Sequence, residues 1–83
     1  MNYITLDNLM IGDKAEVKKI KTDNSICRRF LDMGIVPGSK IECIMKSPGG
    51  DPVAYLIKGA LIAIRNDDAK NILINRLGSN NYE

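Results

Sequence analysis

The chain has 83 residues, which is enough for one small domain with a thin core. Its residues are 45% hydrophobic and 27% charged, a composition that is typical of folded proteins and excludes the disordered class. Twelve Lys and Arg against ten Asp and Glu give a formal charge of +2 with both signs interspersed, which argues against a nucleic-acid binder with a concentrated basic face. Histidine is absent, which removes the commonest metal ligand and the usual general base.

The first residues, "MNYITLDN", lack the basic flank and the apolar stretch of a signal peptide, and no apolar run approaches the roughly 20 residues that cross a bilayer. We therefore expect a cytoplasmic protein that meets a membrane only through a partner. A structural disulfide is not expected in that compartment, so we predict that Cys27 and Cys43 are buried thiols.

The N-terminal third predicts a turn, a strand and a helix. Leu6 and Leu9 are spaced to face one way in a short turn, and a strand follows through Ala15 and Val17. The helix is capped by one of residues 23–25, and its apolar stripe consists of Ile26, Cys27, Phe30, Leu31 and Met33. Gly34 is predicted to end the helix in a left-handed conformation, with Ile35 packing back on the last turn.

The rest of the chain is predicted to form short strands at 40–46, 53–58, 60–65 and 72–74, with a capped turn at 66–71. A tight hairpin is expected at Gly59. We expect one domain over 1–75 and a flexible polar tail over 76–83. About five short strands and one α-helix predict a mainly β fold, a small antiparallel SH3-like barrel in which the helix plugs one opening.

The sequence offers little material for catalysis or metal binding. A nucleophilic Cys27 would need a base or an electropositive helix start to lower its pKa, and a small core residue is the simpler interpretation. A structural zinc site needs four soft ligands, and the chain has two thiols sixteen positions apart. "GIVPGSK" has the wrong spacing for a phosphate loop. We therefore predict a non-enzymatic protein with no cofactor and no metal site.

The segment "SPGGDPVAYLIKGALIAIR" is apolar on both faces of its predicted strands. Val53, Tyr55 and Ile57 share one face, and Ala54 and Leu56 share the other. A small barrel has only one interior, and leaving large apolar side chains in water forgoes roughly 1.5–3 kcal/mol apiece. Either the N-terminal turn covers the second face, or that face is a surface for a partner.

The loop "SPGGDP" precedes these strands. Its prolines fix their own φ angles, and the Asp51 carboxylate is expected to accept hydrogen bonds from nearby loop amides. Such a stiff projection would lose little entropy on docking, although a hairpin of this length also needs glycine and proline for purely structural reasons.

Four ordered segments resemble the FeoA family of domains associated with ferrous iron uptake. The segments are "LDNLMIGDKAEV", "RRFLDMGIVPGSKI", the "PGGDP" loop with the "GALIAIR" strand, and the alanine of "NDDA". Phe30 replaces an expected leucine, and residues 21–24 lack a usual glycine. The resemblance implies an SH3-like fold and a cytosolic accessory role for FeoB, a large membrane iron permease whose soluble portion is a GTPase.

On this basis we expect a binding module that docks on the permease through the helix, the loop and the outward apolar strand face. The expected contact residues are Arg28, Arg29, Met33, Gly49, Gly50, Asp51, Pro52 and Tyr55. Two alternatives stay open for the helix: the arginines can form a solvated face, and Met33 can complete the core stripe.

Other functions stay open from the sequence. One is a metal-responsive regulatory domain, similar to the SH3-like domain of iron-dependent repressors, that binds iron through Asp67, Asp68 and Glu42. Another is an RNA-binding small barrel. Self-association through an apolar strand edge is also open.

Overall fold

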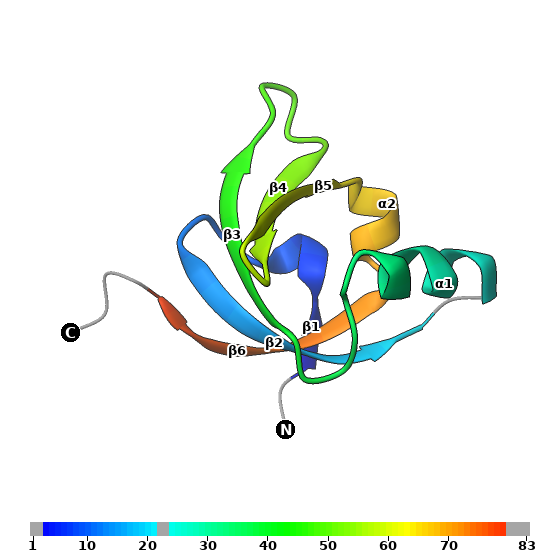
Figure 1. Ribbon diagram of the computed structural model, residues 1–83. Helices are drawn as coiled ribbons and strands as arrows, with labels where there is room; N and C mark the ends of the chain where they lie inside the picture. Colours follow the sequence, from blue (N-terminus) through cyan, green and yellow to red (C-terminus); the bar gives the residue numbers. More distant parts are fainter. Residues whose placement is uncertain (1–2, 22–23, 80–83) are drawn as a thin grey trace.

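The computed structural model describes residues 3–21 and 24–79, which form a curved antiparallel sheet with two helices and a 3₁₀ turn (Figure 1). The six strands of these residues lie in the order β1-β6-β2-β3-β4-β5. Their bounds are β1 Tyr3–Thr5, β2 Asp13–Ile20, β3 Lys40–Lys46, β4 Val53–Ile57, β5 Ala60–Ile64 and β6 Ile72–Ser79. The other elements are η1 Leu6–Asn8, α1 Asn24–Asp32 and α2 Asn66–Ala69. The prediction of a mainly β antiparallel fold is therefore confirmed, with six strands among the described residues where about five were predicted.

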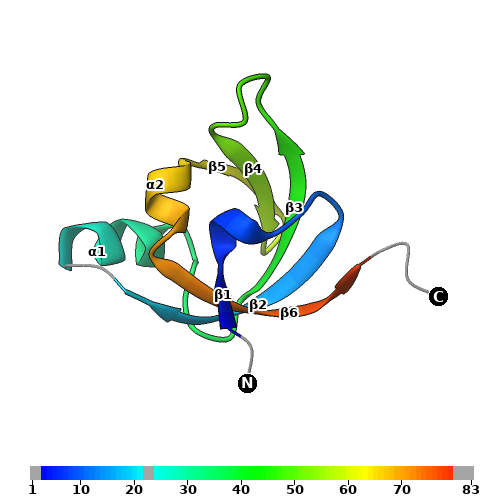
Figure 2. The ribbon, with the colours of Figure 1, turned by 180° about the vertical axis from the view of Figure 1, so that it is seen from behind.

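The core lies inside the curve of the sheet. Alternate residues of the strands face it, and the turn at η1 adds Leu6 and Leu9, both fully buried. Figure 2 shows η1 on the inner side of the sheet, where it lies beside α2. The hydroxyl of Tyr55 donates a hydrogen bond to the Leu6 carbonyl at 3.4 Å, so the N-terminal turn covers the Tyr55 face of β4.

Helix α1 ends as its sequence predicts. Gly34 has a φ of +89°, its amide donates to the Leu31 carbonyl at 3.0 Å, and the Ile35 amide donates to Phe30 at 2.8 Å. This pair of bonds is a Schellman motif, and Ile35 is fully buried. Residue 23 and the side chains of residues 24–27, including Cys27, lie outside the described part, so the expected cap and that thiol stay predictions.

Two strands differ from the sequence prediction. β1 was not predicted, and β6 runs to Ser79, so residues 76–79 belong to the sheet and not to a polar tail. The reason is long-range pairing: β6 lies between β1 and β2, with Asp13 opposite Ser79 and Ala15 opposite Arg76. Arg76 Nε also lies 3.5 Å from a carboxylate oxygen of the buried Asp13. Residues 80–83 lie outside the described part.

Candidate partner-binding surface

The loop between β3 and β4 is closed by two backbone hydrogen bonds of its own. The Ser47 amide donates to the Pro52 carbonyl at 3.1 Å, and the Gly50 amide donates to the Ser47 carbonyl at 2.7 Å. Gly50 has a φ of +87°, a conformation that glycine adopts without a steric cost. Gly49, Asp51 and Pro52 are exposed. The loop thus presents three of its four predicted contact residues to solvent and holds the fourth, Gly50, at the turn.

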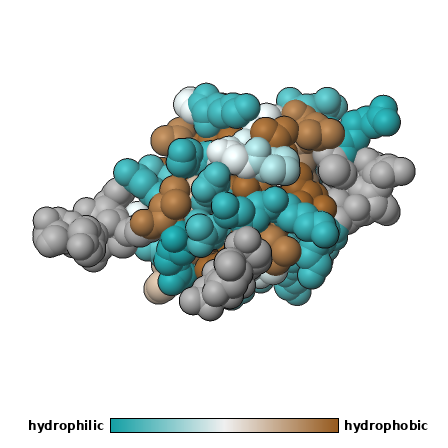
Figure 3. All heavy atoms as spheres, turned by 90° about the horizontal axis from the view of Figure 1, so that it is seen from below, coloured by the Kyte–Doolittle hydropathy of each residue, from teal (hydrophilic) through white to brown (hydrophobic). Residues whose placement is uncertain are grey.

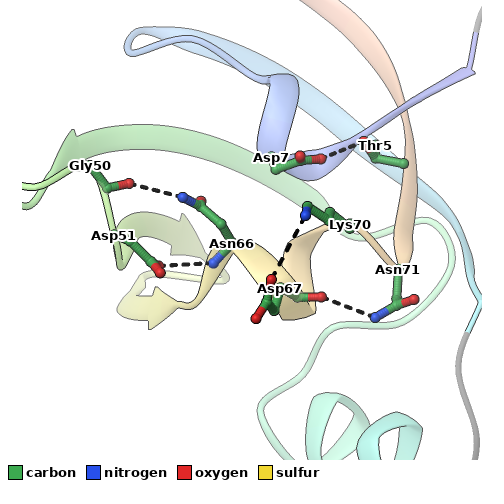
Figure 4. Close-up of polar contacts among 8 residues, drawn as sticks. All are labelled: Thr5, Asp7, Gly50, Asp51, Asn66, Asp67, Lys70 and Asn71. Carbon is green, nitrogen blue, oxygen red and sulfur yellow. Dashed lines mark hydrogen bonds and ion pairs between the residues drawn. The ribbon is translucent and has the colours of Figure 1, made fainter.

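The same loop is anchored on α2, far along the chain (Figure 4). The Asn66 amide donates to Asp51 Oδ1 at 2.9 Å, and Asn66 Nδ2 donates to the Gly50 carbonyl at 3.0 Å. We had expected Asp51 to bond to amides of its own loop, and it instead satisfies an amide at the start of a helix, where backbone donors lack helical partners. Asn66 was missed by sequence reasoning, although its place after a predicted strand is typical of a helix start.

Helix α1 and the residue after it carry three of the predicted contact residues, and two of these, Arg29 and Met33, lie near α2. Arg28 and Arg29 are exposed, and Arg29 forms an ion pair with Asp68 of α2 at 4.0 Å. Met33 is half-buried against the core and lines a hollow of about 130 Å³ together with Asp68 and Ala63 of β5. An ion pair at the surface contributes at most about 1 kcal/mol to stability. It therefore favours one orientation of the Arg29 side chain but does not hold the side chain rigidly.

Tyr55 must be removed from the set of surface contacts. It is only 1% exposed, its hydroxyl bonds to Leu6, and burial raises its pKa, with smaller contributions from Cys43 and Asp7. A side chain in this position supports the fold and does not reach a partner. The error arose because both faces of the segment are apolar, so alternation alone did not say which face was outward.

The outward face of β3, β4 and β5 carries apolar side chains, several of which are exposed. We call it the outer strand face and define it by Met45, Ala54, Leu56, Leu61 and Ala63. Leu56 lies opposite Leu61, and Ala54 lies between Met45 and Ala63 in the register. Leu61 is 59% exposed, so the N-terminal turn covers one face of the segment and leaves this one open. Figure 3, viewed from below, shows apolar surface emerging in patches between hydrophilic side chains.

A groove of about 420 Å³ adjoins the outer strand face at Leu56. It extends across the outer side of the sheet from β4 to β6, and its walls include Lys14, Lys40, Glu42, Leu56, Lys58 and Leu77. Lys14 and Glu42 are opposite one another in the β2–β3 register. None of these residues was in the predicted contact set, because only the folded sheet brings Leu77 and Leu56 to one hollow.

The described residues do not support the carboxylate metal site that the sequence left open as an alternative. No three Cys, Asp or Glu side chains among them gather as possible ligands, so Glu42 of β3 does not form a group with Asp67 and Asp68 of α2. Cys43 is fully buried, as predicted, and burial raises the pKa of its thiol, with Lys46 opposing that shift. Neither described helix is long and apolar enough to span a bilayer.

Comparison with known proteins identifies the family of the chain. The model of the FeoA domain matches residues 4–76. A Porphyromonas gingivalis fusion of Fe(2+) transport protein A with the Fe(2+) transporter FeoB is 32% identical over 75 residues, which are 90% of this chain. The chain spans only 9% of that fusion protein. It also spans only 16% of the AMP phosphorylase of Methanococcus aeolicus, which it matches at 30% identity over 92% of its own length.

Solved structures share the whole fold. A FeoA-like protein from Clostridium acetobutylicum superposes with a TM-score of 0.88 at 32% identity, covering 100% of this chain and 96% of the other. The zinc complex of FeoA from Stenotrophomonas maltophilia, described as a prokaryotic SH3 domain protein, gives a TM-score of 0.77 at 26% identity and covers 87% and 89% of the two chains.

Proposed function

This chain belongs to the FeoA family, and from that premise we propose that it is a non-enzymatic accessory protein for ferrous iron uptake that binds the cytosolic GTPase portion of a FeoB-type membrane iron permease. A relative that carries a FeoA segment and FeoB in one polypeptide supports the pairing, because fusion keeps two interacting domains at high effective concentration.

The observation that carries this proposal is the position of the anchored loop beside the outer strand face. Met45 and Ala54 lie next to the loop at its base on β3 and β4, and Ala63 continues the face toward Met33, the residue that follows α1. An apolar area next to a preorganised loop is typical of a docking surface, because the loop loses little entropy on binding. The proposed contacts are Arg28, Arg29, Met33, Gly49, Gly50, Asp51 and Pro52, with Leu61 in place of Tyr55.

The test is a binding measurement between this chain and the soluble portion of a FeoB-type permease by biolayer interferometry. We expect the double variant Asp51→Ala and Leu61→Asp to bind at least about tenfold more weakly, because both the loop anchor and the exposed apolar centre are altered. Leu31→Asp is the matched control, since Leu31 is a similarly exposed leucine on α1 outside the proposed contacts. Unchanged affinity of the double variant would contradict the proposed surface.

A further inference from the structure

The residues that line the groove on the outer side of the sheet indicate which kind of molecule would bind there. Leu56 and Leu77, 37% and 48% exposed, form apolar walls on β4 and β6. Lys14, Lys40 and Lys58 are exposed at its border, against one acidic residue, Glu42. The lining therefore combines apolar walls with a net charge of +2, which favours an occupant that is apolar on one side and acidic at its edges.

The sheet also restricts the shape of the occupant. The groove crosses β2, β3 and β4, each of which has a hydrogen-bonded neighbour on both sides. An extended segment lying there would find few free backbone partners, whereas a helix satisfies its own backbone groups and needs only side-chain contacts. The three strand spacings from β6 to β4 amount to roughly 14 Å, which about ten helical residues span.

Two other occupants fit less well. An anionic membrane surface would meet the Glu42 carboxylate, which lies between Lys14 and Leu56 in the register of the sheet. A second copy of the chain would have to offer an acidic helix, but α1 carries Arg28 and Arg29 and α2 has only four residues. Among the described residues α1 therefore has the wrong charge, and α2, although acidic through Asp67 and Asp68, is too short to span the groove.

We propose that the groove binds an acidic amphipathic helix of the partner, with the apolar side chains of that helix between Leu56 and Leu77 and its carboxylates beside Lys40 and Lys58. This inference deepens the proposed function and rests on it for the identity of the partner. An acidic helix of the partner would thus bind the outer side of β2, β3, β4 and β6, a surface that does not include the loop or α1.

The probe is a fluorescent synthetic peptide of about twelve residues with leucines at helical spacing and glutamates on both flanks. A matched peptide has lysines in place of the glutamates. Fluorescence anisotropy is expected to show the acidic peptide binding at least about tenfold more tightly, with an affinity that falls as salt is raised. Amide chemical shifts of the full chain should change around Leu56 and Leu77. Equal binding of the two peptides, or shifts confined to another surface, would overturn the proposal.

Variants separate the groove from the rest of the surface. The double variant Lys40→Glu with Lys58→Glu is expected to bind the acidic peptide at least about fivefold more weakly and to bind the lysine peptide more tightly than the wild type does. The double variant Leu56→Ser with Leu77→Ser should bind the acidic peptide about tenfold more weakly. Lys19→Glu and Leu31→Ser, both exposed and outside the groove, are the controls and should leave binding unchanged. Because all these positions are exposed, thermal unfolding should stay near wild type, and weaker binding then reports the groove.

The soluble portion of the permease distinguishes this inference from the proposed function. If that portion binds the chain and the groove variants bind it equally well, the groove assignment is wrong and the proposed function stands. If the acidic peptide binds the groove and the permease portion does not bind at all, the groove chemistry stands and the identity of the partner is wrong.

Discussion

Tyr55 is a single side chain that joins β4 to the N-terminal turn. Its hydroxyl donates to the Leu6 carbonyl at 3.4 Å in the core. We expect Tyr55→Phe to lower the free energy of unfolding by at most about 1 kcal/mol at neutral pH, because the Leu6 carbonyl loses one hydrogen bond and keeps the one from the Leu9 amide. Urea unfolding measures the change. A shift as large as that of a core truncation would contradict this account, since the ring of phenylalanine fills the same space.

The raised pKa of Tyr55 gives the same residue a pH dependence. Burial keeps the phenol neutral in the native state, whereas an unfolded tyrosine ionises near pH 10. The unfolded state therefore releases its proton first, and stability falls as the pH rises above about 10. The pKa of Cys43 is raised in the same direction and adds to the loss at somewhat lower pH. Unfolding free energies between about pH 8 and 11 should decline less steeply for Tyr55→Phe. Equal slopes would contradict this prediction.

The end of α1 was predictable because its signals are local. Gly34 has a φ of +89°, and a Cβ added there would meet Lys58 Cδ at 3.5 Å, an ordinary contact. The cost of Gly34→Ala should therefore come from backbone conformation alone, about 1 kcal/mol. Gly49→Ala is the matched control, since no left-handed φ or close atom constrains Gly49, and it should be near neutral in urea unfolding. Equal effects of the two substitutions would contradict this explanation.

Strand β6 shows the opposite case, in which the decisive information is not local. Residues 76–79, "RLGS", have a largely polar and glycine-containing sequence, and their pairing with β2 and the contact between Arg76 and Asp13 make them a strand. Patterns within a segment can predict α1, β3 and the hairpin at Gly59, but they cannot predict which distant strand supplies hydrogen bonds.

Deleting parts of the C-terminal segment tests the assignment of β6. Removal of residues 80–83 should leave the unfolding free energy within about 0.5 kcal/mol, whereas removal of residues 76–83 should lower it by about 2 kcal/mol or more, because pairs with β2 and the Arg76 contact are lost. Thermal and urea unfolding give both values. If the longer deletion had no larger effect than the shorter one, residues 76–79 would be a tail, as the sequence first suggested.

The outward direction of the apolar strands could be settled only by the complete fold. Both faces of β4 are apolar in sequence, and the position of Leu6 and Leu9 inside the curve makes the Tyr55 face the buried one. The candidate surface depends on the same assembly, because the Asn66 side chain, which anchors the loop, comes from a helix that follows β5. The sequence could indicate the loop and the arginines, but not the anchor or the groove.

The loop, α2 and α1 are connected in series, through Asp51 with Asn66 and then Asp68 with Arg29. We expect Asp51→Ala to release the loop from α2. The Asn66 amide should then exchange hydrogen several-fold faster, and binding of the permease portion should weaken several-fold, since a free loop loses more entropy on docking. Hydrogen exchange and biolayer interferometry measure the two effects on one sample.

Asp67→Ala is the control that separates anchoring from charge. Asp67 lies in α2, its side chain is 94% exposed, and its substitution removes the same negative charge without touching the loop. Asp51→Asn keeps an oxygen that accepts from the Asn66 amide and should retain most of the protection. If Asp51→Ala and Asp67→Ala reduced binding equally, the negative charge of the loop and α2, and not the order of the loop, would determine the affinity for the permease portion. If neither changed the exchange of Asn66, the loop would be held by its own closure alone, through Ser47, Gly50 and Pro52.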